Sequence, residues 1–117
     1  NKFISKKYKN KIYPCKTIRD KNFLALSSRN SLLSINELSK ARLVSKYLFK
    51  LKLSFKKKNQ SHKNILIKKK ELQKRFNIKI DYLELRNEKN LSAFTKTKKI
   101  RLFVAYYIGK VRLIDNF

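Results

Sequence analysis

The stretch Ile100-Arg-Leu-Phe-Val-Ala-Tyr-Tyr-Ile-Gly-Lys-Val-Arg-Leu113 decides the fold of the C-terminal part of this chain. Apolar side chains recur at alternate positions through its first nine residues, which is the period of a strand with one buried face. Gly109-Lys110 then supplies the two residues of a type II′ or type I′ hairpin turn, and Val111 begins the return strand. The stretch therefore predicts a pair of antiparallel strands.

An amphipathic helix is predicted upstream of this hairpin. Ser34-Ile-Asn-Glu37 is a capping box, in which the serine oxygen accepts a hydrogen bond from the Glu37 N–H and the glutamate bonds back. Apolar residues then recur at helical spacing: Leu38, Ala41, Leu43, Val44, Tyr47, Leu48 and Leu51. Residues 54–63 are polar and lysine-rich and are expected to form a connecting loop.

A second helix is predicted from Ile65, Leu66, Leu72 and Phe76, with a left-handed cap near Asn77. A strand with one break in its alternation follows it, formed by Ile78, Ile80, Tyr82, Leu83 and Leu85. The order of elements predicts an α+β fold in which helices pack on one face of a small antiparallel sheet.

The N-terminal part has a different pattern. Residues 1–10 mix apolar residues with lysines, as in the end of an amphipathic helix. Ile12-Tyr-Pro-Cys15 is predicted as an edge strand, with Cys15 as a small buried apolar residue, and residues 16–30 as a loop.

The composition limits the class of protein. A chain of 117 residues suffices for one domain, and no stretch approaches the roughly 18 apolar residues of a membrane span. No secretory signal pattern is present, and one cysteine cannot form an internal disulfide. We therefore expect a cytoplasmic protein without a membrane partner.

The net charge of +25 could indicate a nucleic-acid partner. However, the cations are 25 lysines against 7 arginines, and they are spread along the chain. Because phosphate and base recognition favours the planar fork of arginine, this pattern favours a solvated surface over a dedicated nucleic-acid site. A small basic RNA-binding protein of ribosomal type remains the alternative interpretation.

Residues for acid–base or metal chemistry are scarce. His62 is a lone histidine in a lysine-rich segment, which does not make a metal site, and Gly109 is the only glycine, which excludes a glycine-rich phosphate loop. No catalytic residue or metal ligand is predicted in this chain. The one polar cluster is Ser27-Ser-Arg-Asn30, which suits a phosphate group but is also compatible with an ordinary turn.

Three blocks of sequence carry a family resemblance: Lys11-Ile-Tyr-Pro-Cys-Lys-Thr-Ile-Arg-Asp20, Leu24-Ala-Leu-Ser-Ser-Arg-Asn30 and Asp81-Tyr-Leu-Glu-Leu-Arg86, followed by the C-terminal hairpin. In this order the chain closely resembles the C-terminal part of the pantoate–β-alanine ligase family. The resemblance implies that residues 1–17 are a helix and strand at the end of a Rossmann-like N-terminal domain. Residues 18–30 would then be an ATP-contacting connection, and residues 31–117 a lid domain.

The resemblance also implies an ATP-dependent, AMP-forming ligase with Mg²⁺ bound to its ATP. Pantoate would be converted to pantoyl adenylate with release of pyrophosphate, and β-alanine would then give pantothenate. Ile18, Leu26, Ser27, Ser28 and Arg29 match the positions that contact ATP in the family. The family's catalytic histidines lie in its N-terminal domain, through which it dimerises, so this chain alone is expected to be inactive.

Two departures from the family pattern concern this site. Asn22-Phe23 stands where the family commonly has Asp-Gly. Since Phe23 should resist a positive φ, we expect the loop to follow a slightly different path. Leu26 replaces a methionine, a volume-conserving change that should be harmless.

Overall fold

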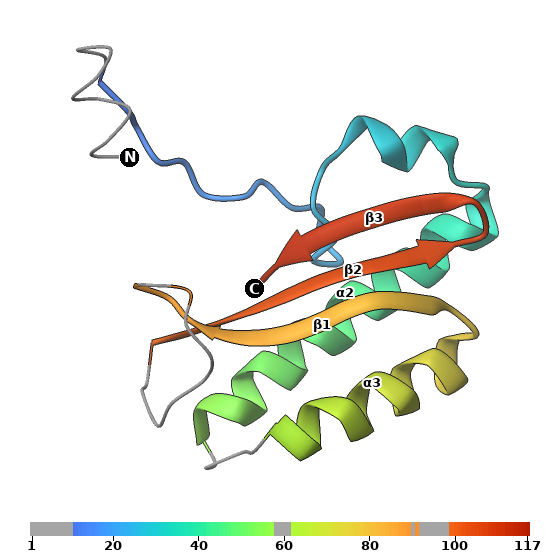
Figure 1. Cartoon of the computed structure of the whole chain (residues 1–117). Coiled ribbons are helices and arrows are strands. Elements are labelled where there is room, and N and C mark those ends of the chain that lie inside the picture. Colours follow the sequence, from blue (N-terminus) through green and yellow to red (C-terminus); the bar gives the residue numbers. More distant parts are fainter. Residues whose placement is uncertain (1–10, 58–61, 90, 92–98) are drawn as a thin grey trace.

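The computed structural model describes residues 11–57, 62–89, 91 and 99–117. A short 3₁₀-helix, η1 (Ser28–Leu32), precedes two α-helices, α2 (Ile35–Lys57) and α3 (His62–Phe76). Three strands follow them, β1 (Lys79–Asn87), β2 (Ile100–Ile108) and β3 (Val111–Asn116). They form one antiparallel sheet in the order β1-β2-β3, and both α-helices cover the same face of it (Figure 1). This confirms the predicted α+β fold.

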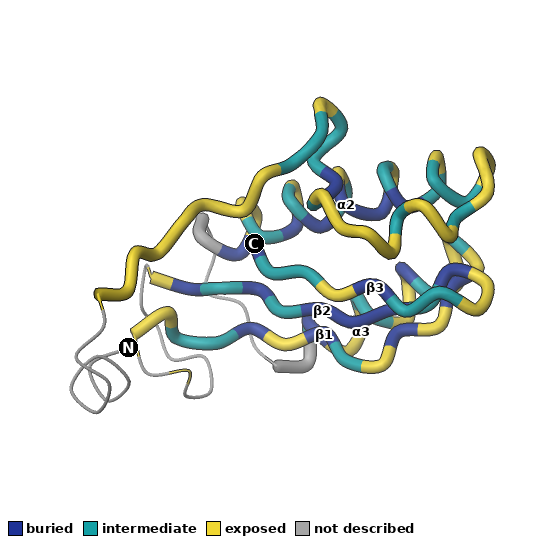
Figure 2. Tube along the Cα trace, turned by 90° about the horizontal axis from the view of Figure 1, so that it is seen from above, coloured by how far each residue is buried: buried dark blue, intermediate teal, exposed yellow. Residues whose placement is uncertain are grey.

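The core lies between this face of the sheet and the two helices. Alternate residues of β2 are buried there, including Leu102 and Tyr106, and they meet Val44 and Leu48 of α2 and Leu72 of α3. These residues are buried together because side chains return to the same face every two residues in a strand and every 3.6 residues in a helix. Figure 2 shows this alternation along the strands, whereas residues 11–18 are exposed.

The capping box forms as the sequence predicts. The Ser34 N–H donates to Glu37 Oε1 (3.0 Å), and the Glu37 N–H donates to Ser34 Oγ (3.1 Å). Glu37 also lies beside the neighbouring hairpin turn, since a Cβ on Gly109 would be 2.5 Å from its Oε2 and would displace the Glu37 side chain. Gly109 has φ +56° whereas Lys110 does not have a positive φ, which fits a type II′ turn and not a type I′ turn.

Two other predicted features are confirmed. Asn77 takes φ +49° at the end of α3, as a left-handed cap requires. The break in the alternation of β1 is a shift in register between Ile80 and Tyr82, where β1 has one residue more than β2. Because of this extra residue, the buried positions change from even numbers (Ile80) to odd numbers (Leu83 and Leu85).

Three expectations were wrong. The run 12–15 forms no strand and is exposed, because no strand lies beside it to accept its backbone hydrogen bonds in the part of the chain that the structure describes. Cys15 is consequently exposed and not buried. The segment 54–63 is not all loop, since α2 continues to Lys57, where Phe55 adds one more buried apolar turn, and α3 begins at His62. The helix expected in residues 1–10 lies outside the described residues.

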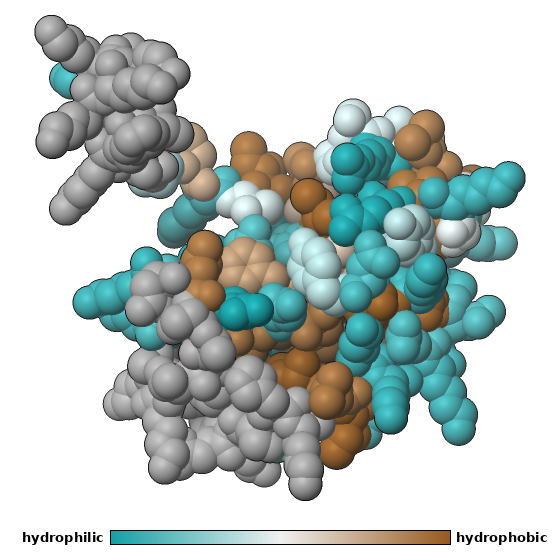
Figure 3. Space-filling model, viewed as in Figure 1, coloured by the Kyte–Doolittle hydropathy of each residue, from teal (hydrophilic) through white to brown (hydrophobic). Residues whose placement is uncertain are grey.

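No helix in the described part of the chain is both long and apolar enough to cross a bilayer. The surface carries hydrophilic side chains over much of the face seen in Figure 3, with hydrophobic patches between them.

Candidate functional site

The chain between residues 18 and 27 folds into a narrow hairpin. The Leu26 N–H donates to the Ile18 carbonyl (2.9 Å), and Arg19 pairs with Ala25 as an antiparallel bridge. This pairing brings Ile18 next to Leu26. Two parts of the predicted ATP-contacting set, separated by seven residues in the sequence, therefore lie together.

The tip of this hairpin is held by Asp20. Its Oδ1 accepts hydrogen bonds from the backbone N–H groups of Asn22 (2.8 Å) and Leu24 (3.1 Å), while Oδ2 accepts from Arg42 Nε on α2 (2.9 Å). Burial raises the pKa of Asp20, but the hydrogen bonds from Arg42 and the two N–H groups outweigh it and leave the pKa below its ordinary value. Asp20 is therefore an anion that ties the tip to α2.

Phe23 at this tip adopts the left-handed conformation, with φ +69°. Its ring stacks on Phe49 of α2, with centroids 4.7 Å apart and planes 17° apart. The expectation that Phe23 would resist a positive φ was wrong. The stacked ring offers a favourable contact that compensates for the steric cost of a Cβ in this conformation.

Arg19 fastens the hairpin to the end of β3. Its Nη1 and Nη2 donate to Asp115 Oδ2 (2.7 Å) and Oδ1 (2.9 Å), a bidentate ion pair. The same guanidinium donates to the carbonyls of Phe23 (2.9 Å) and Asn116 (2.7 Å). It also lies over the ring of Phe117, 4.5 Å from the centroid. One side chain thus links the hairpin to the C-terminal strand by four hydrogen bonds and a cation–π contact.

The predicted phosphate-contacting residues follow this anchored hairpin. Ser27 caps η1, its Oγ accepting from the Arg29 N–H (3.2 Å). The Arg29 side chain reaches β3, where Nη1 donates to the Arg112 carbonyl (3.4 Å). All five predicted residues, Ile18, Leu26, Ser27, Ser28 and Arg29, are exposed. The site therefore presents hydroxyls, a guanidinium and two apolar side chains to solvent on a braced backbone.

This arrangement can bind an anion but offers no evident acid–base catalyst. The two carboxylates near the hairpin, Asp20 and Asp115, are both engaged by arginines. Among the described residues no group of three His, Cys, Asp or Glu side chains is close enough to hold a metal ion. The side chains of the site therefore do not fit as direct ligands of Mg²⁺.

The sequence interpretation missed the part that Arg19 and Asp115 play. Both belong to blocks that carry the family resemblance, and this was the only signal available, because 96 positions separate them.

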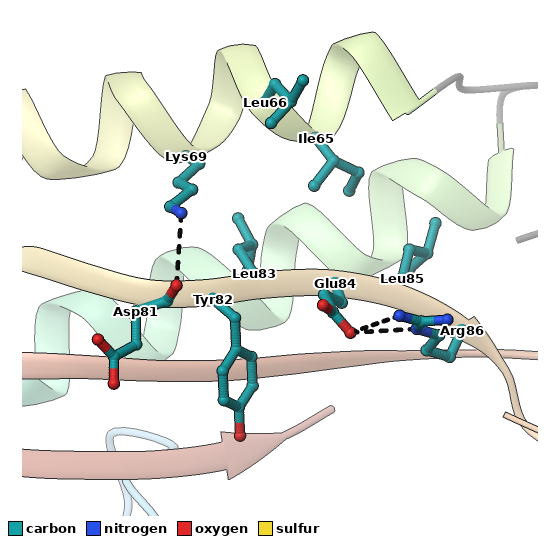
Figure 4. Close-up of a pocket in the computed structure, with 9 residues that line it drawn as sticks. All are labelled: Ile65, Leu66, Lys69, Asp81, Tyr82, Leu83, Glu84, Leu85 and Arg86. Carbon is teal, nitrogen blue, oxygen red and sulfur yellow. Dashed lines mark hydrogen bonds and ion pairs between the residues drawn. The ribbon is translucent and has the colours of Figure 1, made fainter. Parts of the chain in front are cut away.

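A separate hollow of about 410 Å³ lies between α3 and β1, at the edge of the sheet opposite to β3 (Figure 4). Its charged groups already have partners: Lys69 Nζ donates to the Asp81 carbonyl (3.5 Å), and Arg86 pairs with Glu84 (2.8 Å). We assign no site to it.

Comparison with known proteins identifies the family. The family model described as pantoate-beta-alanine ligase matches residues 3–117. The pantothenate synthetase of Endomicrobium trichonymphae is 41% identical over 111 residues, which is 93% of this chain and 38% of that protein. The pantothenate synthetase of Clostridium acetobutylicum is 40% identical, over 91% of this chain and 38% of that protein. The chain thus spans about 38% of the length of these curated relatives.

Solved structures agree with this. The pantothenate synthetase of Thermus thermophilus superposes with a TM-score of 0.71 at 28% identity, covering 86% of this chain and 37% of that one. The Francisella tularensis pantoate-beta-alanine ligase, complexed with beta-gamma ATP and beta-alanine, has a TM-score of 0.63 at 30% identity and covers 99% of this chain and 37% of that one. Nothing in these comparisons favours the alternative interpretation of a small RNA-binding protein. The chain belongs to the pantoate-beta-alanine ligase family.

Proposed function

We propose that this chain is the C-terminal part of a pantoate–β-alanine ligase and that its hairpin segment binds ATP. The observation that carries the proposal is the exposed Ser27-Ser28-Arg29 turn. The preceding hairpin is held against the folded domain by the bonds of Arg19 to Asp115 and of Asp20 to Arg42. A phosphate site needs donors that stay in place when an anion binds, and this backbone is braced at both ends.

In the proposed reaction the pantoate carboxylate attacks the α-phosphate of ATP. The bond to the β-phosphate breaks, and pantoyl adenylate and pyrophosphate result. The amine of β-alanine then attacks the acyl carbon and expels AMP, which gives pantothenate. Charge accumulates on the leaving pyrophosphate in the first step, and the Arg29 guanidinium with the serine hydroxyls would stabilise it.

Ile18 and Leu26 have a different part in this proposal. The two residues are 70% and 61% exposed and are joined by a backbone hydrogen bond across the hairpin, which suits contact with the adenosine portion through backbone and apolar surface. Mg²⁺ would arrive bound to the ATP phosphates, since the carboxylates of this site are engaged. The histidines that the family uses, the pantoate site and the dimer contact would belong to the N-terminal domain, in a cytoplasmic homodimer.

The test substitutes Arg29→Gln in the full-length protein and measures pantoate-dependent release of pyrophosphate. We expect the rate to fall on the order of a hundredfold, as for other donors to developing charge, with the melting temperature unchanged because Arg29 is exposed. Arg75→Gln is the matched control, being an exposed arginine at the end of α3. An equal loss of rate in both variants, or a loss of folding in Arg29→Gln, would contradict the proposed part.

A further inference from the structure

Two more cations lie next to Arg29, at the turn between β2 and β3. An open hollow of about 420 Å³ there is lined by Arg29, Leu32, Lys110, Val111 and Arg112. Every polar side chain among these lining residues is a cation. A hollow of this composition repels cations and attracts anions.

The backbone fixes how these cations are placed. Arg29 Nη1 donates to the carbonyl of Arg112, so the first arginine is fastened to the strand that carries the second. Arg112 Nε in turn donates to Asp81 Oδ2 on β1 (2.9 Å), which anchors one side of its guanidinium. Lys110 extends from the exposed turn beside them. Two carboxylates lie near these three cations, Asp81 and, beside Gly109 of the same turn, Glu37. The site therefore keeps a net positive charge, which a multivalent anion would offset.

We propose that Lys110 and Arg112 join Arg29 in binding the pyrophosphate portion of the nucleotide. The inference rests on the proposed function, because Arg29 is common to the hollow and to the Ser27-Ser28-Arg29 turn. A diphosphate carries several charges on adjacent phosphoryl groups, so it can contact a guanidinium fork and a lysine ammonium at once. In this arrangement the serines hold one end of the phosphate chain and the β2–β3 turn holds the other.

The surface of the molecule offers a matched comparison. A groove between α2 and α3 is also lined by cations, Lys46, Lys50, Lys68 and Arg75, and is of similar size at about 550 Å³. General attraction by the net charge of +25 would act at both places. Binding of pyrophosphate at the proposed site should instead depend on the cations that line the hollow at the turn and not on those of the groove.

The experiment titrates inorganic pyrophosphate alone into the purified protein by calorimetry, near physiological ionic strength. Lys110→Gln is expected to weaken binding by about fivefold, and Lys110→Glu by more, while Lys50→Gln in the helical groove changes it less than about twofold. Lys110 is exposed at the turn, and thermal unfolding of each variant checks that the fold is retained. Equal weakening by Lys110→Gln and Lys50→Gln, or no binding at millimolar pyrophosphate, would overturn the inference.

ATP binding by Arg29→Gln separates this inference from the function on which it rests. If Arg29→Gln weakens ATP binding and Lys110→Gln leaves pyrophosphate binding unchanged, the inference fails and the proposed function stands. The opposite result is also informative. If Arg29→Gln leaves ATP binding intact, the proposed contact of Arg29 with ATP is wrong. If Lys110→Gln nevertheless weakens pyrophosphate binding selectively, the turn between β2 and β3 still binds pyrophosphate.

Discussion

Arg19 and Asp115 form a bidentate ion pair across 96 positions of sequence, with only 20% and 7% of their side chains exposed. The pair joins the hairpin that precedes the Ser27-Ser28-Arg29 turn to the last strand of the sheet. Because the same guanidinium also bonds the carbonyls of Phe23 and Asn116, this side chain positions the candidate ATP site on the β3 side, as Asp20 and Arg42 do on the α2 side.

Replacing Arg19 by lysine should destabilise the protein although the charge is kept. An ammonium has three N–H groups and cannot make the four hydrogen bonds of the planar fork, so at least one of the acceptors on Phe23, Asp115 and Asn116 loses its bond to this side chain. We expect Arg19→Lys to lower the free energy of unfolding by about 2 to 3 kcal/mol, measured by urea denaturation.

Arg86→Lys is the control for this prediction. Its ion pair with Glu84 has a similar distance of 2.8 Å, but both side chains are more than one third exposed. Water screens such a pair, so the substitution should cost less than about 0.5 kcal/mol. Equal costs for the two substitutions would show that the hairpin is not fastened through Arg19.

The elements with local signals could be predicted from the sequence. The alternation in β2, the capping box at Ser34 and the left-handed cap at Asn77 each depend on residues only a few positions apart. The edge strand at 12–15 failed for the opposite reason, since a strand exists only where a neighbour accepts its hydrogen bonds.

The residues of the candidate site are still a prediction from the sequence, and their geometry comes from the structure alone. The structure places Ser27, Ser28 and Arg29 on an exposed turn. The brace that holds them depends on contacts with α2 and β3 that are distant in sequence, and no local pattern reports these. Phe23 shows the same limit, because its stack with Phe49 outweighs the local preference against a positive φ.

Phe23→Gly should therefore be less damaging than Phe23→Ala. Both substitutions remove the ring that stacks on Phe49, but alanine keeps the Cβ that disfavours φ +69°, whereas glycine accepts this conformation. We expect the glycine variant to be more stable than the alanine variant by about 1 kcal/mol in thermal or urea unfolding.

Asn77→Gly is the control for Phe23→Gly. It also removes a Cβ at a residue with positive φ, but it removes no stacked aromatic ring. Asn77 is exposed, has φ +49° and ends α3, so glycine there should be neutral or stabilising by up to about 1 kcal/mol. If Phe23→Ala proves as stable as Phe23→Gly, the left-handed conformation of the hairpin tip would be excluded.

Tyr106 makes the fold sensitive to alkaline pH. Burial raises the pKa of its hydroxyl from 10.0 to about 12, against the opposing hydrogen bond with Ser45, and the side chain is only 1% exposed. The unfolded chain therefore loses this proton at a lower pH than the folded protein does. The stabilisation is complete below pH 10 and is lost as the pH rises toward 12, a change of about 2 to 3 kcal/mol.

Comparison with Tyr106→Phe isolates this effect from the titration of the many lysines, which both proteins share. The unfolding free energy of the unsubstituted protein minus that of Tyr106→Phe should fall steadily with increasing pH above 10, measured by urea denaturation at a series of pH values. A difference for Tyr106→Phe that stays constant with pH would mean that the hydroxyl ionises as readily in the folded protein as in the unfolded chain. Tyr106 would then not lie in the closed core between the sheet and α2.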